Sequence, residues 1–392
     1  VWHSNYDFDT DQPVKIKIIV DDGNTQPREL IYPPNNTLTV NNGPIPVSSW
    51  SPMPNRTATT TIGCEEADGA IYDDKLYAIC ADLTGVGGGR VSIFDFTTNT
   101  WEVESNEINL VQSRSDYTST LVNGKIYTYG GQNTNVGGDS LEAIRASTNS
   151  LLEFDPTTSS VNTILSGGIA RRNHTAVGYE NRLYIHGGLL DEGFSTTNTM
   201  DIFDTITNQW TTGSPSPSNR YQHDSVLYNG KIYLFGGRSE SGARNVFLNV
   251  EVYDISTNSW STISNTLVYQ TMGTATLIDG LIYLIGGEDD FGQVVDVFIF
   301  DPESSQFLES DLITEPAVSS RKDHLAAAYN GRIYIFGPPS DSFQRYTPKN
   351  SNKTLVSFNR KSAEILEGNW DLSKVDKEEL KTLLIDQIEN RV

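Results

Sequence analysis

The chain has 392 residues, 37% of them hydrophobic, which is enough to bury a substantial core, and its formal net charge is −22. Nearly all of this charge, −19, falls between residues 47 and 346, whereas residues 1–46 carry −3 and residues 347–392 carry 0. A surface this acidic repels phosphate backbones, so nucleic acid is not an expected partner. The sequence contains no run of 18 apolar residues, so no transmembrane segment is predicted.

The first 46 residues form an N-terminal arm with its own pattern. The stretch VKIKIIV, residues 14–20, alternates lysine with β-branched residues and is followed by Asp-Gly, which predicts an edge strand in a β-hairpin. Carboxylates at positions 7, 9 and 11 are spaced like the start of a calcium loop. The glycine and the distal glutamate of such a loop are missing, so a solvated turn is expected here and no metal site.

After the arm, one element returns at nearly constant intervals. NGKIYLFGG, residues 229–237, is repeated as NGKIYTYGG, NRLYIHGG and DGLIYLIGG, and the first glycines of these pairs are 57, 49 and 50 residues apart. The same register continues to Cys80 upstream and to Gly337 downstream. A second marker accompanies the first, an aspartate followed six residues later by Trp, Val or Phe: Asp95, Asp155, Asp204, Asp254 and Asp301.

A period of about 50 residues with these markers resembles the kelch family, over residues 47–346. The resemblance implies four short strands per repeat, with Asn-Gly or Asp-Gly turns between the first two. Six repeats carry the NGKIY-like element, but five carry the aspartate marker, and Trp50 supplies the missing aromatic residue from the other end of the chain. We predict an all-β, six-bladed kelch-type β-propeller closed by this N-terminal outer strand.

Residues 347–392 are expected to be a linker followed by a C-terminal amphipathic helix. Leu380, Leu383, Leu384 and Ile388 recur at the spacing of one helical face. A single helix of this length is marginal alone, so its apolar side should be buried, either on the propeller flank or on a partner in a larger assembly. The residues predicted to make these contacts are Trp370, Leu380, Leu384 and Ile388.

Two columns of polar residues align with the repeats. Sixteen residues before the first glycine stand Arg114, Arg171, Arg220 and Arg321, and three residues further on stand His174, His223 and His324. The kelch resemblance places these columns near the mouth of a central channel. Two interpretations remain open: the arginines bond backbone carbonyls and carboxylates between blades, or some of them bind an acidic peptide or a sugar acid at the channel mouth.

The two cysteines, Cys64 and Cys80, occupy the arginine and glycine positions of the first repeat, where they face each other across one strand pair. A disulfide is predicted; the alternative is two buried thiols. A disulfide favours an oxidising compartment, as do the glycosylation sequons at Asn35, Asn55 and Asn352 and a chain that starts at Val1, as it would after loss of a signal peptide. An extracellular or cell-surface location is expected, with the cytoplasm as the alternative.

The loops between the second and third strands are the other variable surface. Repeat two carries an insertion in residues 132–150, and repeat four carries a basic and aromatic group, Arg238, Arg244 and Phe247, which is a candidate partner-binding patch. The corresponding loop of repeat five is acidic, with Glu288, Asp289 and Asp290. Solvated loop tips are the alternative for both.

No G-x-S-x-G, H-E-x-x-H, C-x-x-C or phosphate-binding loop occurs, so no cofactor is expected and the favoured function is not enzymatic. The kelch resemblance implies a binding or structural module for protein–protein or acidic-ligand interactions. It also leaves two alternatives: a mutarotase-like enzyme for an acidic sugar at the channel mouth, and a cytosolic scaffold.

Overall fold

The computed structural model describes residues 49–56, 64, 66–80, 90–102, 114–133, 147–164, 167–190, 195–239, 246–264, 271–289, 292–293, 297–308, 323–337 and 342–348, together with strands β1 (Ile16–Val20) and β2 (Arg28–Tyr32). The chain divides into two compact units, residues 43–349 and residues 1–42 with 350–392. In the second unit β1 and β2 pair antiparallel, with Val20 opposite Arg28. The predicted acidic turn and C-terminal helix lie outside the described residues.

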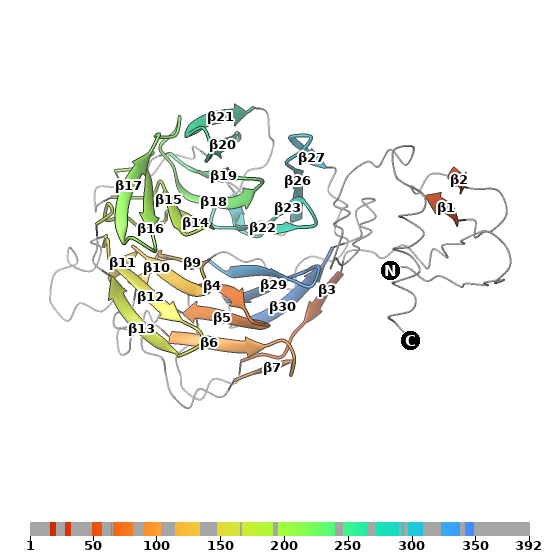
Figure 1. Cartoon of the computed structure of the whole chain (residues 1–392), viewed down its shortest axis with the longest axis horizontal. Coiled ribbons are helices and arrows are strands. Elements are labelled where there is room, and N and C mark those ends of the chain that lie inside the picture. The colour runs from red at the N-terminus through yellow and green to blue at the C-terminus, as the bar shows by residue number, and fades with distance from the viewer. Residues whose placement is uncertain are drawn as a thin grey trace. The chain divides into compact units, whose positions relative to one another are not determined.

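The larger unit is a ring of six four-stranded antiparallel sheets, as predicted (Figure 1). Small accessory ladders add β8 (Arg114–Ser115) to β11 (Gln132–Asn133) and β24 (Glu288–Asp289) to β25 (Gly292–Gln293). The blades, from the inner to the outer strand, are β4 (Ala67–Tyr72), β5 (Lys75–Cys80), β6 (Arg90–Asp95) and β7 (Thr100–Trp101); β9 (Thr118–Val122), β10 (Lys125–Tyr129), β12 (Leu151–Asp155) and β13 (Ser160–Ile164); β14 (Thr175–Tyr179), β15 (Arg182–His186), β16 (Met200–Asp204) and β17 (Gln209–Gly213); β18 (Tyr221–Tyr228), β19 (Lys231–Arg238), β20 (Val250–Asp254) and β21 (Ser259–Ile263); β22 (Thr274–Ile278), β23 (Leu281–Ile285), β26 (Val297–Asp301) and β27 (Gln306–Leu308); and β28 (Leu325–Tyr329), β29 (Arg332–Gly337), β30 (Ser342–Thr347) and β3 (Ser49–Pro52).

The ring is closed by a strand from the start of the propeller sequence. Strand β3 pairs with β30 of the sixth blade, which places Trp50 opposite Tyr346, and the centroids of the two rings are 5.0 Å apart. This confirms the predicted outer strand. Because the first and last segments of the propeller share one sheet, the blade ring has no unpaired end that could open.

Tight turns join the two inner strands of each blade. In the turn between β18 and β19, Asn229 and Gly230 have φ angles of 48° and 68°. Two successive residues with positive φ form the type I′ turn, whose twist matches that of the flanking strands. The Asn-Gly and Asp-Gly pairs read from the sequence therefore determine where the inner hairpin turns in blades two, four, five and six, whereas blade one turns at Asp73-Asp74 and blade three at Glu180-Asn181.

In blades one and four the tryptophan marker bonds the linker that enters the blade, through Trp101 to Pro54 O and Trp260 to Ser214 O. In blade four, Asp254 Oδ1 accepts hydrogen bonds from the backbone N–H groups of Ser256 and Thr257, which holds the turn into β21. Trp260 then packs 5.0 Å from the Tyr253 ring and donates its Nε1–H to the Ser214 carbonyl, 2.8 Å away, in the linker from blade three. The marker thus shapes the outer turn and anchors the preceding linker.

The core lies between neighbouring sheets. The second strand of each blade is the most deeply buried, and every residue of β23 is buried. Its side chains alternate between the two flanking blades: Ile282 and Leu284 belong to one apolar cluster, whereas Leu281 and Tyr283 belong to another. Burial on both faces explains the continuous apolar runs in these strands.

Candidate functional site

The predicted arginine column lies inside the blades. Arg114, Arg171 and Arg220 are only 3%, 0% and 0% exposed, and each donates from Nη1 to the carbonyl of the first glycine of its own blade, sixteen residues later. The acceptors are Gly130, Gly187 and Gly236, at 3.2, 2.8 and 3.0 Å. Each arginine therefore ties the entry of the innermost strand to the end of its hairpin partner. Arg321 lies outside the described residues.

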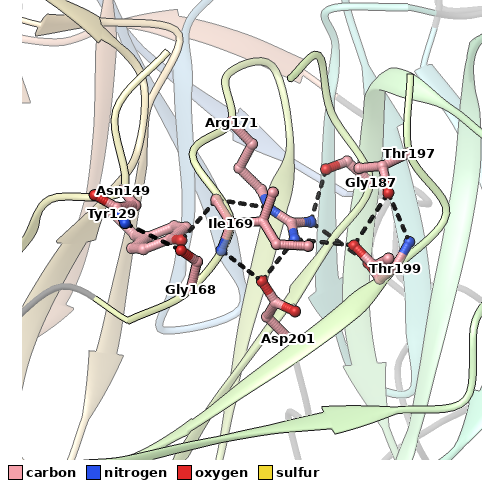
Figure 2. Close-up of polar contacts among 9 residues, drawn as sticks. All are labelled: Tyr129, Asn149, Gly168, Ile169, Arg171, Gly187, Thr197, Thr199 and Asp201. Carbon is pink, nitrogen blue, oxygen red and sulfur yellow. Dashed lines mark hydrogen bonds and ion pairs between the residues drawn. The ribbon is translucent and has the colours of Figure 1, made fainter. Parts of the chain in front are cut away.

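Figure 2 shows this arrangement around Arg171 in blade three. Its Nη2 donates to Asp201 Oδ2 at 2.7 Å and to Thr199 Oγ1 at 3.0 Å. The same Asp201 oxygen accepts the backbone N–H of Ile169 at 3.0 Å. The guanidinium group is thus surrounded by acceptors of its own fold, as a buried charge requires.

Arg220 is paired in the same way with Glu251 of β20. Their Nη2 and Oε1 atoms are 3.0 Å apart, both side chains are fully buried, and the guanidinium lies 4.2 Å from the centre of the Phe247 ring. Burial lowers the pKa of Arg220, while Glu251 opposes this shift, and burial lowers the pKa of Arg114 to about 10. The geometry of all three arginines favours the structural interpretation of the column over ligand binding.

In blade one the same two positions are joined covalently. Cys64 and Cys80 form a disulfide, with Cα atoms 5.0 Å apart and a sequence separation of 16. This confirms the predicted disulfide. The bond takes the place of the arginine-to-glycine hydrogen bond of blades two, three and four, because it fastens the same two points of the inner hairpin.

The histidine column joins neighbouring blades. His174 Nε2 lies 2.9 Å from Thr118 Oγ1 of blade two, and His324 Nε2 lies 3.3 Å from Thr274 Oγ1 of blade five. His223 Nε2 of blade four lies 2.9 Å from His186 Nδ1 of blade three. Burial lowers the pKa values of His174 and His223 well below the ordinary value, so both are neutral at pH 7.

A ring of hydrogen bonds encircles the channel two residues after the arginine column. Asn173 N–H donates to Asp116 O at 2.9 Å, Gln222 N–H to Asn173 O at 2.9 Å, and Met272 N–H to Gln222 O at 3.2 Å. Asp323 and Ala67 continue the series, and the Glu66 carboxylate closes it by accepting Asp116 N–H at 2.6 Å. This column was not predicted from the sequence. Its signal is partial: Asp116, Asn173 and Asp323 are residue types that tolerate the positive φ found there, but Gln222 and Met272 adopt the same φ.

The ring surrounds a pocket on the channel. The pocket has a volume of about 240 Å³, and all six blades line it. Its lining includes five carboxylates and the three histidines, and none of the described lining residues is arginine or lysine. The carboxylates are Glu66, Asp68, Asp116, Asp224 and Asp323. Such a lining suits a cationic or neutral hydrogen-bonding group rather than the predicted acidic ligand.

Comparison with known proteins identifies the repeat. The family model of the KLHDC2/KLHL20/DRC7 Kelch-repeats domain matches residues 87–211 and 134–338, the second match alone spanning more than half of the chain. The chain belongs to the kelch-repeat family. A solved structure titled "Structure of YjhT" has a TM-score of 0.60 and 15% identity, with 76% of this chain and 98% of that chain covered. At this identity the likeness shows the fold alone. No curated protein matches the chain significantly.

The two candidate loop patches of this kelch protein meet each other. Arg238 Nη2 lies 3.2 Å from Glu288 Oε1 of the next blade, which neutralises one charge of each patch. Phe247 packs against Arg220 rather than standing alone at a loop tip. Arg244 lies outside the described residues, as do Trp370, Leu380, Leu384 and Ile388, so partner binding at those positions stays a prediction.

Of the glycosylation sequons, Asn55 is exposed, whereas Asn35 and Asn352 lie outside the described residues. Asn173, which also begins an Asn-x-Thr sequence, belongs to the channel ring, where its side-chain amide donates to Asp116 Oδ1, so it serves the fold.

No helix in the described ranges is long and apolar enough to cross a membrane. Within those ranges, no group of three or more His, Cys, Asp or Glu side chains is arranged to hold a metal ion.

Asp224 differs from the other pocket carboxylates. Among the described residues, none donates a hydrogen bond to its side chain or pairs with it. Part of the side chain is exposed to the pocket, although protein surrounds it on every side, and this burial raises its pKa to about 7. Asp68 also has a pKa raised to about 7, but its carboxylate accepts the backbone N–H groups of Ser119 and Gly69.

We expect Asp224→Asn to stabilise the propeller in a pH-dependent manner. The raised pKa means that the folded state binds a proton more tightly than the unfolded state, so Asp224 lowers stability progressively from about pH 4 to about pH 7. The gain from the variant should be absent near pH 4 and reach about 1–3 kcal/mol at pH 8. Urea unfolding of both proteins at several pH values measures it. Asp73→Asn, in an exposed turn, is the matched control, and an equal gain at pH 4 would contradict the expectation.

Proposed function

We propose that this kelch propeller is a protein-binding module that receives a segment of its partner at the mouth of the channel. The observation that supports this most is the pocket, because all six blades contribute to it. The described arginines of the neighbouring column do not line it; they bond glycine carbonyls within their own blades. A concave site at the axis of a rigid ring is a typical binding location for a propeller.

The second strands of the blades end on the side of the ring where the innermost strands begin, which is the side of the pocket. Tyr221, at the start of β18, pairs with Arg238, at the end of β19, and in blade two Ser115 pairs with Gln132. The loops between the second and third strands therefore leave the sheets beside the pocket mouth. A bound peptide that enters the pocket would also contact them, and loops on a rigid scaffold are where specificity usually arises.

Peptide selection tests this function. A random peptide library should yield binders to the immobilised propeller, and hydrogen exchange on each complex should show protection of the inner strands and of the loops at the mouth. Protection confined to the outer strands β13, β17 and β21 would contradict the proposed binding face. Each selected peptide should be displaced from the immobilised propeller by soluble propeller. If no selected peptide is displaced in this way, the binding function is contradicted.

We also propose that the protein acts outside the cytosol. The Cys64–Cys80 disulfide is compatible with an oxidising compartment, and Asn55 is accessible to a glycan. Peptide mapping of unreduced protein from its natural source should recover the crosslinked cysteines and a glycan on Asn55. Two free thiols with an unmodified Asn55 would instead favour the cytosolic scaffold.

The enzymatic alternative, a mutarotase-like activity on an acidic sugar, lacks a specific observation in its favour. A sugar carboxylate would be placed among five carboxylates in the described pocket, without an arginine or lysine in the lining to bind it. We therefore retain the binding module as the proposed function.

A further inference from the structure

Twelve residues before the first glycine, four of the six blades carry a polar side chain that bonds to the following blade. In blade one Asp68 accepts the backbone N–H of Ser119, and in blade three the Thr175 hydroxyl contacts that of Ser225. In blades two and five this position is a threonine that contacts the histidine of the following blade: Thr118 with His174 at 2.9 Å, and Thr274 with His324 at 3.3 Å. The hydroxyl and the imidazole thus satisfy each other across the blade boundary. A polar side chain at this position is normally paired with its neighbour in the ring.

Blade four breaks this pattern on both sides of the boundary. Asp224 stands in place of the threonine, and blade five has Gly273 where the histidine would stand. Glycine has no side chain to offer a donor, which explains why Asp224 has no hydrogen-bond or ion-pair partner among the described residues. Asp224, Gly273 and the adjacent Met272 all line the pocket. The missing side chain leaves space next to a bare carboxylate.

The remaining carboxylates of the pocket have partners within the fold. Glu66 accepts the backbone N–H of Asp116, Asp68 accepts two backbone N–H groups, and Asp116 accepts the side-chain amide of Asn173. Asp323 also interacts with other residues of the chain. Asp224 therefore differs in kind from the acidic residues around it: it is a desolvated acceptor that the described fold leaves unused.

We infer that the pocket takes a basic side chain, lysine or arginine, from the bound partner, with Asp224 as its acceptor at the boundary between blades four and five. This inference rests on the proposed function and specifies its ligand. The carboxylate is only partly exposed, so a cation that reaches it forms a charge-assisted hydrogen bond at a smaller desolvation cost than at a fully exposed carboxylate. Met272 and Gly273 also line the pocket and carry no polar side-chain group, so they can lie against the aliphatic stem of such a side chain.

The long-range field favours the same class of ligand. The chain carries a formal net charge of −22, so a basic segment is attracted before contact, whereas an acidic one is repelled. A general attraction of this kind does not depend on any single residue. The experiment must therefore separate local recognition by Asp224 from the overall charge.

Matched tripeptides give this separation. Acetyl-Gly-Arg-Gly-amide and its lysine counterpart are titrated into isotopically labelled full-length protein at pH 8, with the citrulline peptide as the uncharged analogue of arginine, and backbone NMR shifts report affinity and location. The arginine and lysine peptides should shift residues around 222–226 and 272–275, and should bind at least tenfold more tightly than the citrulline peptide. Asp224→Asn should remove this difference, whereas Asp73→Asn, which deletes the same charge from an exposed turn, should preserve it.

Several outcomes would overturn the inference: equal affinity for arginine and citrulline, unchanged binding by Asp224→Asn, or equal losses in both variants, which would indicate net charge alone. Peptides selected from the library that protect the channel mouth but lack basic residues would refute this inference while supporting the proposed function. Tight binding of the arginine peptide, without any library peptide that binds at the channel mouth, would support the basic-side-chain site and contradict the proposed peptide-binding function.

Discussion

Replacing Arg220 by alanine is expected to lower the free energy of unfolding by about 3–5 kcal/mol. The guanidinium and the Glu251 carboxylate are both fully buried with 3.0 Å between them, so the variant leaves a buried carboxylate without its cation. It also removes the bond to Gly236 O that ties the inner hairpin together. Urea unfolding followed by tryptophan fluorescence measures the loss.

An exposed ion pair provides the matched control for Arg220. Arg182 lies 3.5 Å from Asp204, but its side chain is 51% exposed, so Arg182→Ala should cost less than about 1 kcal/mol. A second variant, Arg220→Met with Glu251→Leu, removes both charges and should recover a large part of the stability lost by Arg220→Ala. If Arg220→Ala were as stable as the wild type, the arginine would be free for a ligand and the structural interpretation of the column would be wrong.

Removal of the Cys64–Cys80 disulfide is expected to lower the free energy of unfolding by about 3 kcal/mol, because a loop of this length loses considerable entropy when it is closed covalently in the unfolded chain. The location increases its importance. Both cysteines pack in a cluster with Leu325, Phe336 and Phe343 of blade six, so the bond stabilises the boundary where the ring closes. The double variant Cys64→Ala with Cys80→Ala, unfolded in urea, measures the effect.

Two comparisons make this prediction specific. Dithiothreitol should lower the stability of the wild type to that of the double alanine variant and leave the variant itself unchanged. Cys64→Arg with Cys80→Gly introduces the pair found in blades two, three and four, and should recover part of the stability if the disulfide replaces the arginine-to-glycine bond. A wild type whose unfolding is insensitive to dithiothreitol would refute the role assigned to the disulfide.

Most of the propeller could be predicted because its features are local and repeated. Asn229-Gly230 specifies a turn through its positive φ angles, Asp254 caps the next turn through its own backbone, and a period of about 50 residues counts the blades. Trp50 could be assigned to the last blade because the marker it supplies is missing there. The disulfide followed from the same register, since Cys64 and Cys80 occupy positions that face each other in blades one to four.

The sequence by itself determined the fold, the number of blades, the closing strand and the disulfide, because each depends on spacing along the chain. Only the tertiary structure decided what the polar columns do. Whether Arg220 faces the channel or Glu251 depends on packing between strands of one blade, and no spacing reports it. The bare carboxylate of Asp224 arises in the same way, because its partner is absent from the next blade, and that neighbour is defined only when the blades are assembled side by side.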